Sequence, residues 1–218
     1  MKLPLALSLC FIMSATASAA EDAGWTVILD AASFKDWKVA PEDGANQVVD
    51  KDGMKEVQKA DGTVLSRWTF ADGVLSADGG VSHIFSPRAD YADFRFSADI
   101  WIGDNSNSGM YFRTTFGNGW PDGYEAQINA NFGDPTKSGS LYGIVNLKEA
   151  PVPAKTWYTQ EVLAEGEHIV ISIDGTVVVD TTHAQRKTGH VAFQQHHQGS
   201  EVKIRNVRIM ELGATKAE

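Results

Sequence analysis

The strongest constraint on the fold is a succession of short strand-like segments with almost no helical periodicity. Apolar and polar residues alternate with a period of two in segments such as ADFRFSADIWIG (92–103) and EHIVISI (167–173). Further strands are predicted at 25–30, 67–70, 73–77, 81–86, 108–115, 123–131, 140–147, 156–164, 176–181, 189–196 and 201–211. Many short strands between turn signals indicate an all-β sandwich or barrel.

Turn residues punctuate this pattern. Asp174-Gly175 lies between HIVISI and TVVVD and predicts a two-residue hairpin, and Asp72-Gly73 is a second turn signal. Residues 31–37 predict one short helical turn. Residues 38–66 are polar and weakly patterned, so we expect a long irregular loop there and not a second domain.

The N-terminus reads as a secretory signal peptide over residues 1–20. Lys2 precedes an apolar run from Leu3 to Met13, small residues follow, and cleavage is expected after Ala19 or Ala20. The run is too short to span a membrane. Leu9 before Cys10 is not the small residue of a lipoprotein signal, so no lipid anchor is predicted. We therefore expect a single domain over 21–218 in the periplasm or secreted.

Charge and cysteine content narrow the choice of partners. Cys10, in the leader, is the single cysteine, so the mature chain has neither disulfides nor thiolate metal sites. A formal net charge of −9 argues against nucleic acid and anionic membranes. It suits an uncharged ligand, or a cation held by carboxylates. The sequence does not indicate the oligomeric state.

The segment GYEAQINANFG (123–133) carries an unusual polar row. With a period of two, Tyr124 and Ile128 face a core, whereas Glu125, Gln127 and Asn129 face the other side. One carboxylate and several amides along one strand face can both donate hydrogen bonds to sugar hydroxyls and accept them.

Two further strands carry comparable rows. In SGMYFRTT, Met110 and Phe112 point to the core, which leaves Tyr111 and Arg113 on the polar side. In GHVAFQQHHQG (189–199), Val191 and Phe193 point to the core, and the outward residues include His190, Gln194 and His196. If the three strands are neighbours, these side chains form one polar surface. The simpler alternative is that Arg113 only pairs with Glu125 as a structural ion pair. His83, His168, His183, His190 and His197 are interpreted as structural or surface residues.

Several motifs in order resemble one known family. SNSGMYFRT (106–114), GYEAQIN (123–129), SGSLYG (138–143), GHVAFQQHHQG (189–199) and VKIRNVRIMEL (202–212) are similar to the 3-keto-disaccharide hydrolase domain family. The resemblance extends over nearly the whole mature chain. This sequence departs from the family pattern at Asn129, where the family usually has Asp, and at Ala31, at Tyr158 and after His196.

The resemblance implies a concanavalin-like jelly-roll sandwich of two antiparallel sheets, with the polar row lining a concave face. It also implies action on glycosides already oxidised at C3. The ketone acidifies the C2 hydrogen, so a base removes that hydrogen, the group at C1 leaves, and water adds to the product. This chemistry needs a base, a proton donor for the leaving oxygen, and a stabiliser of the enolate.

The resemblance also gives the candidate residues their roles. Glu125 and His196 are the candidate acid–base pair, with either role open to each, and Arg113 would stabilise the enolate or hold Glu125. A divalent cation held by Glu125 and His196 is the alternative to direct proton transfer. The candidate substrate-binding residues are Asn107, Tyr111, Trp120, Gln127, Asn129 and Gln194, with Trp120 as a stacking wall.

Three other function classes are alternatives to this enzyme. A non-catalytic carbohydrate-binding domain of the same fold would use this surface only for hydrogen bonds and stacking. An endoglucanase of the laminarinase type would need Glu-x-Asp-x-x-Glu on one strand, and this sequence lacks that motif. A purely structural envelope protein would not need three polar rows. The sequence does not decide between the enzyme and the binding domain, because Asn129 replaces a carboxylate that would favour the enzyme. We take an enzyme acting on a small glycoside or an oligosaccharide as the leading hypothesis and a binding domain as the alternative.

Overall fold

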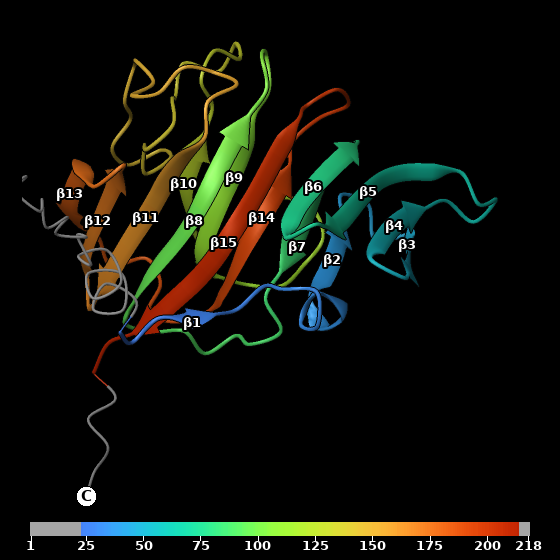
Figure 1. The fold of residues 1–218 in the computed structure, drawn as a ribbon, viewed down its shortest axis with the longest axis horizontal. Coiled ribbons are helices and arrows are strands. Elements are labelled where there is room, and N and C mark those ends of the chain that lie inside the picture. The colour runs from blue at the N-terminus through green and yellow to red at the C-terminus, as the bar shows by residue number, and fades with distance from the viewer. Residues whose placement is uncertain (1–22, 214–218) are drawn as a thin grey trace, which may run out of the picture.

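The computed structural model describes residues 23–213 and shows two antiparallel β-sheets packed face to face (Figure 1). The larger sheet has the strand order β13-β12-β11-β8-β15-β6-β5-β4-β3, with β1 beside β15, and the smaller sheet has the order β10-β9-β14-β7-β2. This confirms the predicted all-β jelly-roll sandwich. The predicted signal peptide at 1–20 lies outside the described residues. No helix within residues 23–213 has the length and apolar character that a membrane span requires.

The elements have the following bounds. In the larger sheet they are β1 Thr26–Val27, β3 Gln47–Lys51, β4 Met54–Gln58, β5 Val64–Ala71, β6 Val74–Gly79, β8 Phe94–Ile102, β11 Tyr158–Glu165, β12 His168–Ile173, β13 Thr176–Thr182 and β15 Val202–Glu211. In the smaller sheet they are β2 Lys38–Pro41, β7 Ser82–Phe85, β9 Ser108–Thr114, β10 Tyr124–Ile128 and β14 His190–Gln195. A 3₁₀ turn at Phe34–Asp36 matches the predicted helical turn.

The core lies between the two sheets and follows the predicted alternation. The smaller sheet buries all the side chains expected to face inward, which are Met110, Phe112, Tyr124, Ile128, Val191 and Phe193. They pack against inward-facing residues of β8, β11 and β15. With the inner face fixed in this way, the alternate residues of β9, β10 and β14 lie on the outer face of the smaller sheet.

Two segments differ from the sequence-based expectation. Residues 38–66 were predicted to be a loop but form β2, β3 and β4. The β3–β4 hairpin lies at the edge of the larger sheet. Some of its positions carry charged residues, whereas a strand is recognised in a sequence by apolar residues at such positions. Lys55 pairs with Asp50 at 2.9 Å, and Glu56 pairs with Lys51. These ion pairs let Lys55 and Glu56 lie buried in β4, which conceals the strand in the sequence.

The predicted strand at 140–147 is the second difference. This segment forms a turn in which Leu141 N–H donates to Val145 O at 3.0 Å, and only isolated bridges are made. It lies along the free edge of β10, where Tyr142 N–H donates to Glu125 O and Gln127 N–H donates to Ser140 O, both at 2.9 Å. The segment is therefore fixed beside the polar row of β10.

The predicted hairpin at Asp174-Gly175 is confirmed between β12 and β13. Both residues have positive φ, 49° and 76°, as the type I′ turn requires.

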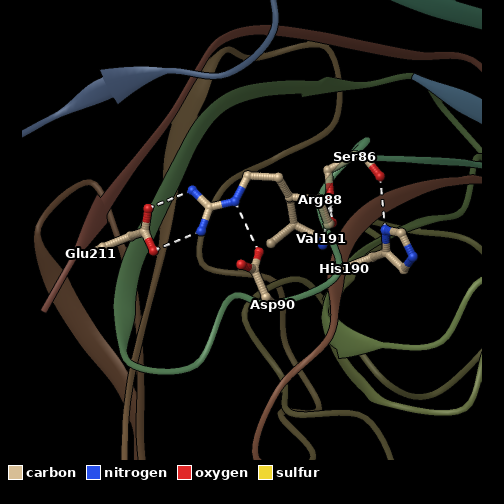
Figure 2. A network of polar contacts seen from close by, with 6 residues as sticks. All are labelled: Ser86, Arg88, Asp90, His190, Val191 and Glu211. Carbon is tan, nitrogen blue, oxygen red and sulfur yellow. Dashed lines mark hydrogen bonds and ion pairs between the residues drawn. The ribbon is translucent and has the colours of Figure 1, made fainter. Parts of the chain in front are cut away.

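The connection from β7 to β8 carries the chain from the smaller to the larger sheet and is anchored by polar contacts (Figure 2). The Arg88 guanidinium donates to both carboxylate oxygens of Glu211, at 2.7 and 3.1 Å, and to Asp90 at 2.9 Å. His190 Nδ1 donates to Ser86 O at 2.7 Å. His190 is therefore a buried structural residue, as expected, and these contacts connect β14 and β15 through the same segment.

Candidate functional site

A cavity of about 360 Å³ lies on the outer face of the smaller sheet. It is lined by Asn107, Tyr111, Trp120, Pro121, Gly123, Glu125, Gln127, Asp134, Tyr142, Gln194 and His196. Strands β9, β10 and β14 provide its floor, and the loops that follow β9 and β10 provide its walls. Its volume lies within the roughly 300–1,000 Å³ of small-molecule sites, and its lining mixes aromatic and hydrogen-bonding side chains as such sites do.

The structure brings together all the sequence-predicted site residues except two. Asn107, Tyr111, Trp120, Glu125, Gln127, Gln194 and His196 line this one cavity. Arg113 and Asn129 do not line it.

Arg113 was placed on the polar face by a strict period of two, and a β-bulge breaks that period. Ala192 pairs with Tyr111, whereas His190 pairs with Thr114, so two residues of β9 oppose one of β14. Arg113 takes up the irregularity with a φ of +47°. Its side chain consequently leaves the polar face.

The Arg113 guanidinium is buried and joins three loops. It donates to Ala92 O at 2.8 Å and Asp93 Oδ1 at 3.0 Å in the β7–β8 connection, to Gly166 O at 2.7 Å and to Arg186 O at 3.3 Å. It neither lines the cavity nor pairs with Glu125, so it holds the ends of strands together. The expectation that it stabilises an enolate or positions Glu125 is wrong.

Asn129 is fully buried and organises the loop after β10. Its amide NH₂ donates to Thr136 O at 2.8 Å and Asp134 O at 3.1 Å, and its Oδ1 accepts from Phe132 N–H at 2.9 Å. Both amide hydrogens and Oδ1 therefore have partners within the loop, and the side chain has no exposed surface to offer a ligand. It positions Asp134, which does line the cavity.

Glu125 lies on the cavity floor in a position that only a glycine neighbour allows. A Cβ at Gly109 on the neighbouring strand would stand 2.2 Å from Glu125 Oε1. Burial raises the pKa of Glu125 to about 8, although a hydrogen bond with Tyr111 lowers it, and the charge of Asp134 raises it slightly. A carboxyl group in this state is largely protonated at pH 7 and can donate a proton.

His196 forms the opposite wall within an aromatic group. Its ring centroid is 5.6 Å from Trp120, 5.5 Å from Phe132 and 5.2 Å from His197. Burial lowers the pKa of His196, and the neighbouring His197 lowers it further. The imidazole is therefore neutral at pH 7 and able to accept a proton.

The amide side chains that line the cavity differ in what they can offer a ligand. Gln127 Oε1 accepts from Ile128 N–H at 3.0 Å, which leaves the Gln127 NH₂ as the group that can donate to a ligand. Gln194 Oε1 and Asn107 Oδ1 are buried atoms without a hydrogen-bond partner in the described chain. Both of these oxygens are enclosed by the chain and have almost no accessible surface, so neither is open to the cavity in this structure.

Sequence reasoning missed several residues at this site. Asp134 and Tyr142 lie on the loop after β10, where the Tyr142 hydroxyl donates to Asp134 Oδ2 at 3.1 Å. Strand periodicity does not reach a loop, although Tyr142 belongs to the SGSLYG motif. His83, interpreted as structural or surface, lies fully buried beneath the cavity, 5.3 Å from the Tyr111 ring and 5.9 Å from the Trp120 ring.

Within residues 23–213, no group of three or more His, Cys, Asp or Glu residues is arranged to hold a metal ion. Glu125 and His196 would therefore give a cation two protein ligands, with the remaining positions left to water or substrate. Coordination by these two residues stays a prediction.

Comparison with known proteins gives one family match. The model of the 3-keto-alpha-glucoside-1,2-lyase-like domain matches residues 24–210. A comparison with curated protein sequences gave no match.

Solved structures resemble this chain in fold. One structure of a "putative glycosyl hydrolase" from Parabacteroides distasonis ATCC 8503 aligns with a TM-score of 0.68 and 22% identity over 92% of this chain and 99% of that chain. A second from the same organism, with the same description, aligns with a TM-score of 0.58 and 21% identity over 66% and 90%. A "native glycosidic hydrolase" gives a TM-score of 0.53 and 14% identity over 85% and 93%.

Proposed function

Because the chain belongs to the 3-keto-alpha-glucoside-1,2-lyase-like domain family, we propose that it cleaves 3-keto-glycosides by elimination across C1 and C2 followed by hydration. The observation that carries this proposal is the pairing of Glu125 and His196 in one cavity. The pKa of the carboxyl is raised and that of the imidazole is lowered. When the surroundings of two titratable groups shift their pKa values apart in this way, the group with the raised pKa can act as the acid and the other as the base. Here Glu125 is the acid and His196 is the base.

In the proposed first step, neutral His196 removes the C2 proton. The electron pair of the C2–H bond forms the enolate, the C1–O bond breaks, and Glu125 gives its proton to the departing oxygen. In the second step the oxygen of a water molecule bonds to C1 while Glu125, now a carboxylate, removes a proton from that water. The His196 imidazolium then returns a proton to C2. Both residues regain their starting states, and the sum is hydrolysis of the glycoside.

The enolate requires a hydrogen-bond donor near the C3 oxygen. Arg113 does not reach the cavity, and the Gln127 NH₂ is the amide donor that lines it. We assign Gln127 this role, since a positioned donor at a developing negative charge typically contributes about a hundredfold or more in rate. Trp120, which is 58% exposed at the rim, supplies an apolar surface for the sugar ring or its aglycone.

A divalent cation could take part at the same two residues. Bound to Glu125 and His196, it would polarise the ketone as a Lewis acid.

The direct test is turnover by the purified mature protein. It is incubated with a panel of 3-keto-glucosides and the matching unoxidised glucosides, with and without chelator, and the released aglycone is quantified. We expect turnover of the oxidised substrates alone. Glu125→Gln and His196→Gln should each lower the rate by about a hundredfold to ten-thousandfold. Glu165→Gln, on an exposed strand end, is the matched control and should leave the rate unchanged.

The alternative of a carbohydrate-binding domain makes a different prediction in the same experiment. Sugar would bind, no oxidised substrate would be cleaved with or without added metal, and Glu125→Gln would change affinity only. We also propose that the protein acts in the periplasm, on the basis of the predicted signal peptide at 1–20.

A further inference from the structure

A row of hydrogen-bonded side chains crosses four strands beneath the cavity. His83 Nε2 on β7 lies 3.2 Å from Gln194 Nε2 on β14, and the same amide nitrogen lies 2.8 Å from the Tyr111 hydroxyl on β9. Tyr111 is in turn hydrogen-bonded to Glu125 on β10, its cross-strand partner. The buried imidazole is thus connected to the candidate acid through two side chains.

The chemistry of these groups fixes the direction of every hydrogen bond in the row. An amide NH₂ can only donate, so His83 Nε2 must be the acceptor and the ring proton lies on Nδ1. The second amide hydrogen goes to the Tyr111 oxygen, and Tyr111 is left to direct its own hydrogen at the Glu125 carboxyl. The Gln194 oxygen is then turned away from the row and has no partner in the described chain.

The surroundings of His83 keep the ring neutral, as this arrangement requires. His83 has no exposed surface, and burial lowers its pKa to about 3, with a smaller contribution from the charge of His196. The His83 ring makes T-shaped contacts with the rings of Tyr111 and Trp120, whose centroids are 5.3 and 5.9 Å away. Its Nδ1 has no hydrogen-bond partner in the described chain, which costs stability relative to an apolar ring of the same size. A purely structural role does not explain why an imidazole is present here.

We propose that His83 is a positioning residue, whose Nε2 lone pair holds the Gln194 NH₂ in place so that this amide directs the Tyr111 hydroxyl at Glu125. The inference rests on the proposed function in taking Glu125 as the acid and the ligand as a 3-keto-glycoside.

The first test needs no substrate. Protein labelled with ¹⁵N-histidine is examined by long-range ¹H–¹⁵N NMR from pH 5 to pH 8, and His83 is assigned by comparison with His83→Gln. We expect the Nδ1–H tautomer and no titration in this range. An Nε2–H tautomer would mean that the Gln194 oxygen faces His83, and titration would mean that the ring is charged. Either result overturns the proposal.

The second test compares two substitutions of the same residue by 3-keto-glucoside kinetics. His83→Phe keeps a ring and removes the acceptor, and His83→Gln keeps an acceptor near the Nε2 position. We expect KM to rise about tenfold or more in His83→Phe, the loss typical of a misdirected buried hydrogen bond, and to stay within a few-fold of wild type in His83→Gln. His168→Phe, at an exposed position, is the control.

The remaining outcomes are also decisive. Equal losses in both His83 variants, or none in either, would show that the acceptor does not matter and would contradict the proposal. Should the wild-type protein cleave no 3-keto substrate, the proposed function fails but the His83 inference is still tested. The NMR tautomer, and the same comparison of variants by affinity for the unreacted 3-keto-glucoside, then decide it.

Discussion

The Glu125 carboxyl occupies the space that a side chain at Gly109 would fill. A Cβ at position 109 would stand 2.2 Å from Glu125 Oε1 and 2.7 Å from the Tyr111 ring. Gly109 is extended and not left-handed, so this close approach, and not backbone strain, explains the glycine. The glycine of the SNSGM motif therefore belongs to the site, although it contributes no functional group.

Gly109→Ala should consequently displace Glu125 and lower turnover. A shift of about 1 Å in a reacting group costs about a hundredfold in rate. The measurement is kcat on a 3-keto-glucoside, with thermal unfolding recorded in parallel. Gly117→Ala, where an added Cβ meets no atom within 4 Å, is the matched control. Wild-type kcat in Gly109→Ala would contradict the placement of Glu125.

The raised pKa of Glu125 predicts a pH-dependent stability. The pKa of Glu125 is 4.5 in the unfolded chain and about 8 in the folded protein. At pH values between these two, the folded protein keeps a proton on Glu125 that the unfolded chain has lost. Stability must therefore fall as the pH rises through this window. Each unit of pKa difference changes the free energy of unfolding by about 1.4 kcal/mol. Because Glu125 faces the cavity, solvent screens its charge and the change is smaller.

Chemical unfolding at pH 5 and pH 8.5 measures this effect. Wild type should lose more stability between the two pH values than Glu125→Gln, which keeps the shape and has no proton to lose. Equal losses in the two proteins would show that the carboxyl is not perturbed.

Arg113→Met should destabilise the protein without a selective loss of catalysis. The substitution leaves the carbonyl oxygens of Ala92 and Gly166 without their buried donor, and we expect a loss of about 2–4 kcal/mol. Arg95→Met, which breaks an exposed ion pair with Glu161, should cost less than about 1 kcal/mol. At a temperature where Arg113→Met is folded, its kcat should equal that of wild type. A large fall in kcat at that temperature would show that Arg113 contributes to catalysis and would contradict its assignment as a structural residue.

The outer face of the smaller sheet was predictable from sequence because a strand period of two is local. That period placed Glu125 and Gln127 on one face and their neighbours in the core. It failed at Arg113, because the bulge depends on the pairing of β9 with β14, which one strand's pattern does not encode. It failed for the β3–β4 hairpin, since ion pairs there replace the apolar signal. It gives no indication of the role proposed for His83, because that role depends on the Gln194 amide of a neighbouring strand.

Processing of the N-terminus is a separate prediction. The exported protein should begin at Ala20 or Glu21, because the apolar run from Leu3 to Met13 is short and small residues follow it. N-terminal sequencing of protein recovered from the periplasm or the medium measures this directly. A mature chain that still begins before Leu3 would contradict it.

The central claim is that cleavage proceeds by removal of the C2 proton in this cavity. The most direct measurement compares initial rates on a 3-keto-glucoside carrying hydrogen or deuterium at C2, with wild type and with His196→Gln. We predict that deuterium slows cleavage by wild type through a primary isotope effect, and that His196→Gln loses the rate but still binds the substrate. Cleavage at the same rate with hydrogen and deuterium under conditions where chemistry limits turnover, and with full retention of the label at C2, would contradict elimination.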